Sequence, residues 1–152
     1  SSRQEVLDAY ASAATLTGDV EKGAKLFSKT CAACHRHGNI GNDRGEKLSA
    51  LQDKSTAFLM TAILDPNRAV DEKYRSFTLL TQDGFSRSGM ITSETASSIE
   101  LVDAEGKQHT ILRIDIDELV SSGVSFMPEG LEKELKPQDF ADIMEFIRSN
   151  SD

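Results

Sequence analysis

Two cysteines and a histidine form the most reactive group of residues in this chain, within the run Cys31-Ala32-Ala33-Cys34-His35. The pattern C-x-x-C-H is the signature of covalent c-type haem attachment. Two thiols one turn apart can each add to a vinyl group on the same porphyrin edge, and the imidazole that follows lies beneath the iron. This assignment uses both cysteines of the chain. It predicts one covalently attached haem c, with His35 as an iron ligand.

Three other chemistries also use closely spaced cysteines: a thioredoxin-like redox pair, a zinc half-site and a structural disulfide. A redox pair is expected after a strand, whereas a helical pattern precedes Cys31. Zinc needs two ligands beyond the thiols, and the choices are His35, His37, His109 and carboxylates. A disulfide between residues so close in sequence closes a very small loop and stabilises little. We favour haem and keep these three as alternatives.

The second axial ligand is harder to choose, because haem iron binds either a second side chain or a small molecule. The chain has four methionines. Met60 and Met144 lie on apolar stripes of predicted helices and Met90 lies in a predicted strand, so we expect these three to pack. Met127 stands in a loop before Pro128, which favours extended backbone and stiffens the segment. We predict Met127 as the second ligand, and the alternative is that it only covers the haem edge.

The histidines other than His35 are weaker candidates for the iron. His37 is too close to His35 to reach the opposite face of the ring, and we expect a solvated loop residue. His109 lies in a predicted strand and is the reserve ligand. The candidate partners for the haem propionates are Arg36, Arg44, Arg68 and Tyr74.

Helical periodicity surrounds the haem motif. Residues 4–16 predict a leader helix, which ends at residues 17–19, where Asp19 offers a cap for the next helix. Residues 20–32 predict that second helix, whose apolar face leads to Cys31. Ser55 is a suitable cap for a third helix, which Asp65 and the following proline end. The last helix opens at Pro137, because proline suits the first helical position.

The periodicity changes to two in the middle of the chain. Residues 77–81 and 86–92 predict a hairpin around the turn at Asp83 and Gly84. Residues 99–101 predict a further strand, and another has four residues on one face: Thr110, Leu112, Ile114 and Ile116. A loop is expected over residues 124–130. We therefore predict a mainly α fold with an inserted antiparallel sheet of about four strands. The expected extents are 1–16 for the leader, 17–152 for the main domain and about 75–119 for the insertion.

Length and charge limit the classes of partner. A chain of 152 residues fits one domain. The net charge of −8 repels phosphate backbones, so we expect no nucleic acid, and it steers the protein toward a basic patch on another redox protein. No apolar run approaches the roughly 20 residues of a membrane span. Bacterial covalent haem attachment is completed outside the cytoplasm, so we expect a periplasmic or otherwise exported protein. Because residues 1–4 lack an export signal, we expect an excised domain.

From residue 19 to residue 148 the sequence resembles the Pirellula/Verrucomicrobium-type haem-binding domain, a cytochrome c relative. The matching segments are 23–27, 31–35, 62–66, 82–84, 125–131 and the helix that opens at Pro137. The resemblance implies a cytochrome c-like helical haem fold in which the helices at residue 20 and residue 137 cross. In that crossing Gly23 allows the contact, and Phe27 and Phe146 pack nearby. It also implies that Met127 is the distal ligand.

Such domains commonly sit at the C-terminal end of larger exported proteins. One position departs from the pattern, since Glu46 stands where related cytochromes carry a proline whose carbonyl accepts a hydrogen bond from the proximal imidazole. Glu46 can supply a carbonyl, but less rigidly, and such a change alters ligand basicity and potential.

The expected function is outer-sphere transfer of single electrons, with no chemical transformation and hence no enzyme activity. The partner is a redox protein or an attached dehydrogenase domain. The alternative is a haem sensor or peroxidase-like enzyme, with an open or labile sixth coordination site. No His/Arg pair flanks Met127 in the sequence, which counts against a peroxidase. A further hypothesis is that the inserted sheet is a docking surface for a parent enzyme or a partner protein.

Overall fold

The computed structural model describes residues 2–149, which form two compact units. The helical unit comprises residues 2–68 and 128–149 of this range, and the sheet unit comprises residues 69–127. The boundaries of these two units do not test the expected ranges of the leader (1–16), the main domain (17–152) and the insertion (about 75–119), so these ranges stay predictions.

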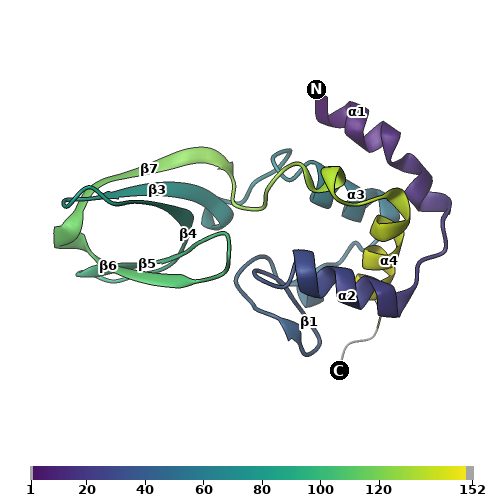
Figure 1. The fold of residues 1–152 in the computed structure, drawn as a ribbon, viewed down its shortest axis with the longest axis horizontal. Coiled ribbons are helices and arrows are strands. Elements are labelled where there is room, and N and C mark those ends of the chain that lie inside the picture. Colours follow the sequence, from purple (N-terminus) through teal and green to yellow (C-terminus); the bar gives the residue numbers. More distant parts are fainter. Residues whose placement is uncertain (1, 150–152) are drawn as a thin grey trace. The chain divides into compact units, whose positions relative to one another are not determined.

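Four α-helices of the described residues lie in the helical unit (Figure 1). They are α1 (Ser2–Ala9), α2 (Val20–Thr30), α3 (Thr56–Leu64) and α4 (Pro137–Arg148). The short 3₁₀ turns of this unit are η1 (Ala11–Thr15), η2 (Leu48–Ala50) and η5 (Leu131–Lys133), and a small hairpin joins β1 (Arg36–His37) to β2 (Ile40–Gly41). The four predicted helices are confirmed, although the leader continues beyond Ala9 as η1.

Side chains fix the first residues of two helices as the sequence predicts. The Asp19 carboxylate accepts a hydrogen bond from the Lys22 amide at 3.0 Å, and the Ser55 hydroxyl accepts one from the Phe58 amide at 3.3 Å. These bonds satisfy amides that have no partner within their own helix. The position of α2 determines where the haem motif begins, because the motif follows its last residue directly.

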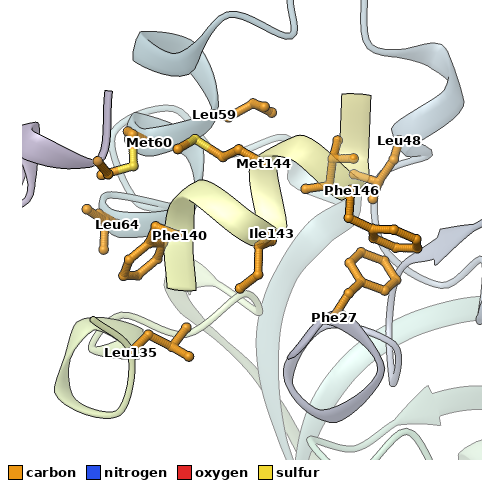
Figure 2. Packing of buried hydrophobic residues seen from close by; sticks show 12 residues of the cluster. Phe27, Leu48, Leu59, Met60, Leu64, Leu135, Phe140, Ile143, Met144 and Phe146 are labelled. Carbon is orange, nitrogen blue, oxygen red and sulfur yellow. The ribbon is translucent and has the colours of Figure 1, made fainter. Parts of the chain in front are cut away.

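The contact between α2 and α4 is the centre of the helical unit. A Cβ at Gly23 would lie 2.0 Å from the Asp142 carbonyl oxygen, so only glycine permits this approach. The rings of Phe27 and Phe146 pack beside it with their centroids 5.2 Å apart (Figure 2). The buried Asp142 carboxylate also accepts a hydrogen bond from the Asp19 amide at 2.8 Å. The expected crossing and its residues are thereby confirmed.

The leader segment belongs to the same core. Val6, Leu7 and Tyr10 pack against the buried cluster, and the Tyr10 hydroxyl donates to the Glu132 carbonyl at 2.7 Å. Arg3 forms an ion pair with the Glu132 carboxylate at 2.7 Å. α1 is thus attached by both apolar and ionic contacts to the segment that follows residue 127.

The sheet unit is a five-stranded antiparallel sheet with strand order β6-β5-β4-β3-β7. Its strands are β3 (Arg75–Thr81), β4 (Ser86–Glu94), β5 (Ser98–Val102), β6 (Gln108–Leu112) and β7 (Ile116–Ser125), with turns η3 (Glu72–Tyr74) and η4 (Arg113–Asp115). The first part of β4, up to Gly89, pairs with β3, and its last part, from Met90, pairs with β5; the register with β5 shifts between Ile91 and Ser93. The sheet therefore folds over into two layers (Figure 1). Its small core contains Leu79, Leu101 and Ile111.

The predicted fold class is wrong. Within residues 2–149, strands cover 27% of the residues and helices, 3₁₀ turns included, cover 38%, and the sheet has five strands rather than about four. The protein is therefore not mainly α. The predicted loop from residue 124 begins too early, because β7 continues to Ser125 and pairs with β3. The strand expected from Thr110 to Ile116 ends at Leu112. Ile114 lies in η4 and is 81% exposed, so it does not share a buried face.

Candidate functional site

The haem motif forms a tight turn at the end of α2. The Cys31 amide donates to the Phe27 carbonyl at 2.8 Å and so continues the helical bonding. The amides of Cys34 and His35 then both donate to the Cys31 carbonyl, at 3.2 and 2.9 Å. Cys31 and Cys34 are free, partly buried thiols. The backbone therefore presents two thiols and an imidazole from one turn.

The environment of the thiols argues against the alternative chemistries. Burial raises the pKa of Cys31 to about 12, with the neighbouring Cys34 adding to the shift. Burial also raises the pKa of Cys34, although Arg44 opposes this. A redox cysteine needs a lowered pKa, because the thiolate is the nucleophile. Within residues 2–149, moreover, no cluster of three His, Cys, Asp or Glu residues is placed to hold a metal such as zinc.

The loop after the motif orients the His35 ring. Its Nδ1 lies 2.9 Å from the Glu46 carbonyl oxygen, and because a carbonyl only accepts, Nδ1 carries the hydrogen. The Nε2 lone pair is then the one available to iron. Glu46 thus supplies the carbonyl that its place in the loop suggested. A Cβ at Gly45 would lie 2.8 Å from Cε1 of the ring, a close approach that the sequence did not predict.

Backbone hydrogen bonds hold this loop against the motif. The amides of Arg44 and Gly45 donate to the Cys34 carbonyl, at 2.9 and 2.6 Å, and the Asn42 amide donates to the Ala32 carbonyl at 3.1 Å. Gly41 has φ +99°, and a Cβ there would lie 2.0 Å from the His35 carbonyl oxygen. The loop and the motif are therefore one rigid piece, which fixes the imidazole from its Nδ1 side.

His37 is buried, so the prediction that it is a solvated loop residue is wrong. It lies in β1, is 6% exposed and places Nε2 3.1 Å from the Ser149 carbonyl oxygen. Its ring packs edge-on against Phe146 with centroids 4.6 Å apart. Burial lowers its pKa, while the bond to Ser149 opposes the shift. His37 therefore joins the motif to the end of α4.

The methionines divide as predicted into packing residues and one loop residue. Met60, Met90 and Met144 are buried at 6, 2 and 1% exposure, which confirms that they pack. Met127 is half-buried, two residues beyond β7, and its amide donates to the Ser125 hydroxyl at 3.1 Å. It belongs to the sheet unit, whereas His35 belongs to the helical unit. Their pairing across one iron stays a prediction.

The reserve ligand and two of the candidate propionate partners already have charged partners in the structure. Nε2 of His109 lies 2.8 Å from the Asp103 carboxylate in the sheet unit, so this nitrogen already has a partner. Two of the arginines form ion pairs, Arg36 with Asp43 at 3.3 Å and Arg68 with Asp65 at 2.9 Å. Tyr74 lies in the sheet unit and Arg44 in the loop around the motif. None is assigned to a propionate.

Helix α3 is strongly apolar and is only partly covered by the core of the helical unit. Its sequence TAFLMTAIL is apolar on all sides, and such a helix is normally covered on all sides. Leu59, Met60 and Leu64 are buried in the core, but Phe58 remains 40% exposed. The two thiols, the oriented imidazole and the glycine that lets the loop lie against the ring fit haem. We conclude that the residues present can hold it.

The comparisons with known proteins agree with this site. The family model described as Cytochrome c matches residues 20–151. No curated protein matches the chain. Across residues 2–149, none of the helices has both the length and the apolar character needed to cross a membrane. Cytochrome c domains bind haem covalently and carry electrons, and the matched residues include the whole C-x-x-C-H motif and its loop. The chain belongs to the cytochrome c family.

Proposed function

We propose that this chain is a single-haem c-type cytochrome domain of the Pirellula/Verrucomicrobium type, which carries single electrons by outer-sphere transfer. In this proposal Cys31 and Cys34 hold the haem covalently, and His35 and Met127 ligate the iron. The observation that carries the proposal is the His35 ring, whose Nδ1 is held by the Glu46 carbonyl at 2.9 Å and whose Nε2 is left for a metal.

The residues of the chain act by fixing and shielding rather than by reacting. Haem supplies a one-electron couple between ferrous and ferric iron. The Glu46 carbonyl sets the tautomer and direction of the His35 ring, and Gly45 lets the loop lie directly against it. A thioether from Met127 favours ferrous iron relative to a second imidazole, which raises the potential within the range of about 0.8 V that axial ligands span.

The test is spectroscopic and uses the holoprotein with three variants. Acid-acetone extraction should leave the pigment on the polypeptide, and the mass should exceed that of the bare chain by one haem. The ferric protein should show a sulfur-to-iron charge-transfer band, which Met127→Ala should abolish. Met144→Leu and Met90→Leu are matched controls, because both side chains are buried, at 1 and 2% exposure, and the substitutions should leave the band unchanged. A band that persists in Met127→Ala would reassign the sixth ligand.

Carbon monoxide separates a closed site from an open one. If Met127 is a firm ligand, the reduced wild-type protein binds carbon monoxide slowly and incompletely, whereas Met127→Ala binds it at once and in full. Rapid stoichiometric binding by the wild type would instead assign the protein to haem sensors or peroxidase-like enzymes.

We further propose that the domain is periplasmic or otherwise exported and serves an attached or partner dehydrogenase. The support is the resemblance, because similar domains sit at the C-terminal end of larger exported redox proteins. The measurement is reduction of the holoprotein by a candidate dehydrogenase, joined to it in one polypeptide or added as a separate protein, followed in the visible spectrum. If the haem spectrum is intact and the dehydrogenase does not reduce the haem, the proposal that this dehydrogenase is the electron donor is wrong.

A further inference from the structure

Three large apolar side chains stand exposed in one part of the sheet unit. Phe85, at the end of the β3–β4 turn, is 64% exposed, and Leu112 and Ile114, where β6 passes into η4, are 48% and 81% exposed. Single exposed hydrophobic residues are ordinary, but a group of them marks an interaction surface. These three residues therefore indicate a surface that binds a partner.

Phe85 and Leu112 both line an open hollow of about 760 Å³. One wall is the β3–β4 turn, and the other is formed by β6 and η4. The chain crosses here from β6, at one edge of the sheet, to β7, at the other edge, in only three residues, so the two layers close on each other (Figure 1). Ile111 of the small core also lines the hollow. Its size suits one or two side chains of a partner.

The charged groups that line the hollow favour a positively charged ligand. Asp83 and Asp115 contribute carboxylates against one guanidinium from Arg87, and the His109 ring, which also lines the hollow, is bonded through Nε2 to the Asp103 carboxylate at 2.8 Å. Within residues 2–149 the Asp115 carboxylate has no hydrogen-bond or ion-pair partner, and Asp83 is bonded through one oxygen to the Thr81 hydroxyl at 2.5 Å. The sheet unit as a whole carries ten Asp and Glu against five Lys and Arg. Complementary charge of this kind selects and steers a partner.

We propose that this hollow docks a segment of a basic partner protein in which an apolar side chain is flanked by lysine or arginine. The apolar side chain lies against Phe85 and Leu112, and the cations pair with Asp83 and Asp115. Arg87 donates to a main-chain carbonyl of the segment. The surface requires no haem chemistry, so its test stands apart from that of the proposed function.

The probe is a labelled peptide, Lys-Lys-Phe-Lys-Lys, added to the isotope-labelled full-length holoprotein in its reduced state. Backbone amide shifts in NMR spectra should change at residues 81–87 and 108–115. The effect should weaken with salt. Two comparison peptides, one with Ser in place of Phe and one with Glu in place of every Lys, should leave these shifts unchanged.

Four variants then test the residues. Phe85→Ser should weaken peptide binding about tenfold, as for loss of an apolar anchor, and Asp115→Lys about fivefold, as for reversal of a rim charge. Glu105→Lys makes the same charge change in the β5–β6 turn, and Val120→Ser removes another exposed apolar side chain of this unit; neither should alter binding. The proposal is wrong if the shifts map elsewhere, if a comparison peptide binds equally, or if Glu105→Lys weakens binding as much as Asp115→Lys. A concentration-dependent dimer that Phe85→Ser abolishes would assign the surface to a second copy instead.

Discussion

Substitution of Gly45 by alanine tests whether the loop sets the electronic state of the proximal imidazole. The new methyl carbon would lie 2.8 Å from Cε1 and 3.1 Å from Nδ1 of His35. To reach an ordinary contact the ring must retreat by about 0.6 Å. The bond from Nδ1 to the Glu46 carbonyl, now 2.9 Å, then exceeds the normal range. That bond makes the imidazole a stronger donor and favours ferric iron, so its loss should raise the reduction potential.

The size of the effect follows from the value of one hydrogen bond. If the bond favours the ferric state by about 1 kcal/mol, its loss raises a one-electron potential by about 40 mV. Spectroelectrochemical titration measures the potential, and NMR of the reduced protein follows the His35 Nδ1 proton. Gly84→Ala is the control, because its Cβ would meet nothing within 4 Å while φ +92° strains the turn. It should lower stability and leave the potential unchanged. An unaltered potential in Gly45→Ala, with an unaltered Nδ1 proton shift, would refute the reasoning.

Three further results are expected. Gly23→Ala should lower the free energy of unfolding by about 2–3 kcal/mol, because its Cβ would lie 2.0 Å from the Asp142 carbonyl oxygen and push α2 away from α4. Urea titrations followed by circular dichroism measure this difference. Equal stability of the variant and the wild type would mean that the two helices can move apart without cost. The hydrogen bond from Arg3 lowers the pKa of Glu132 in the folded protein below its usual value of 4.5. The ion pair therefore stabilises the folded state fully above the usual pKa, and this stabilisation is lost as the pH falls through the lower pKa of the folded state. Glu132→Gln should therefore flatten the loss of stability on acidification, and an identical acid profile would show that the pair contributes nothing. Cys34→Ser should retain haem through one thioether and move the visible bands to longer wavelength, because one vinyl group stays conjugated; unshifted bands would count against a link through Cys34.

Local patterns predicted the elements that carry chemistry, because their signals lie within a few residues. The cap at Asp19, the motif at Cys31 and the opening of α4 at Pro137 are each readable from neighbouring residue types and agree with the structure. β7 was partly missed because most of its side chains are exposed and the run around Gly123 has the composition of a loop. Its pairing with β3 is a long-range contact that periodicity does not report.

The same limit applies to parts of the site. His37 has the sequence context of a loop, and its burial comes from Phe146 and Ser149, which are more than a hundred positions away. The role of Gly45 depends on the position of a ring ten residues earlier and has no signature in residue type. Met127 was chosen from its loop and the proline after it, and that choice awaits the spectrum of its variant.

The partly buried thiol of Cys31 has a consequence for the order of events during maturation. With a pKa of about 12, the folded chain keeps almost no thiolate at this position near neutral pH. A polypeptide that folded first would therefore resist acquiring its pigment, whereas a nascent, still open one exposes the sulfur to water and to whatever machinery delivers the porphyrin. We expect the apoprotein to be captured before it compacts, so that attachment precedes folding and the finished domain is closed to exchange.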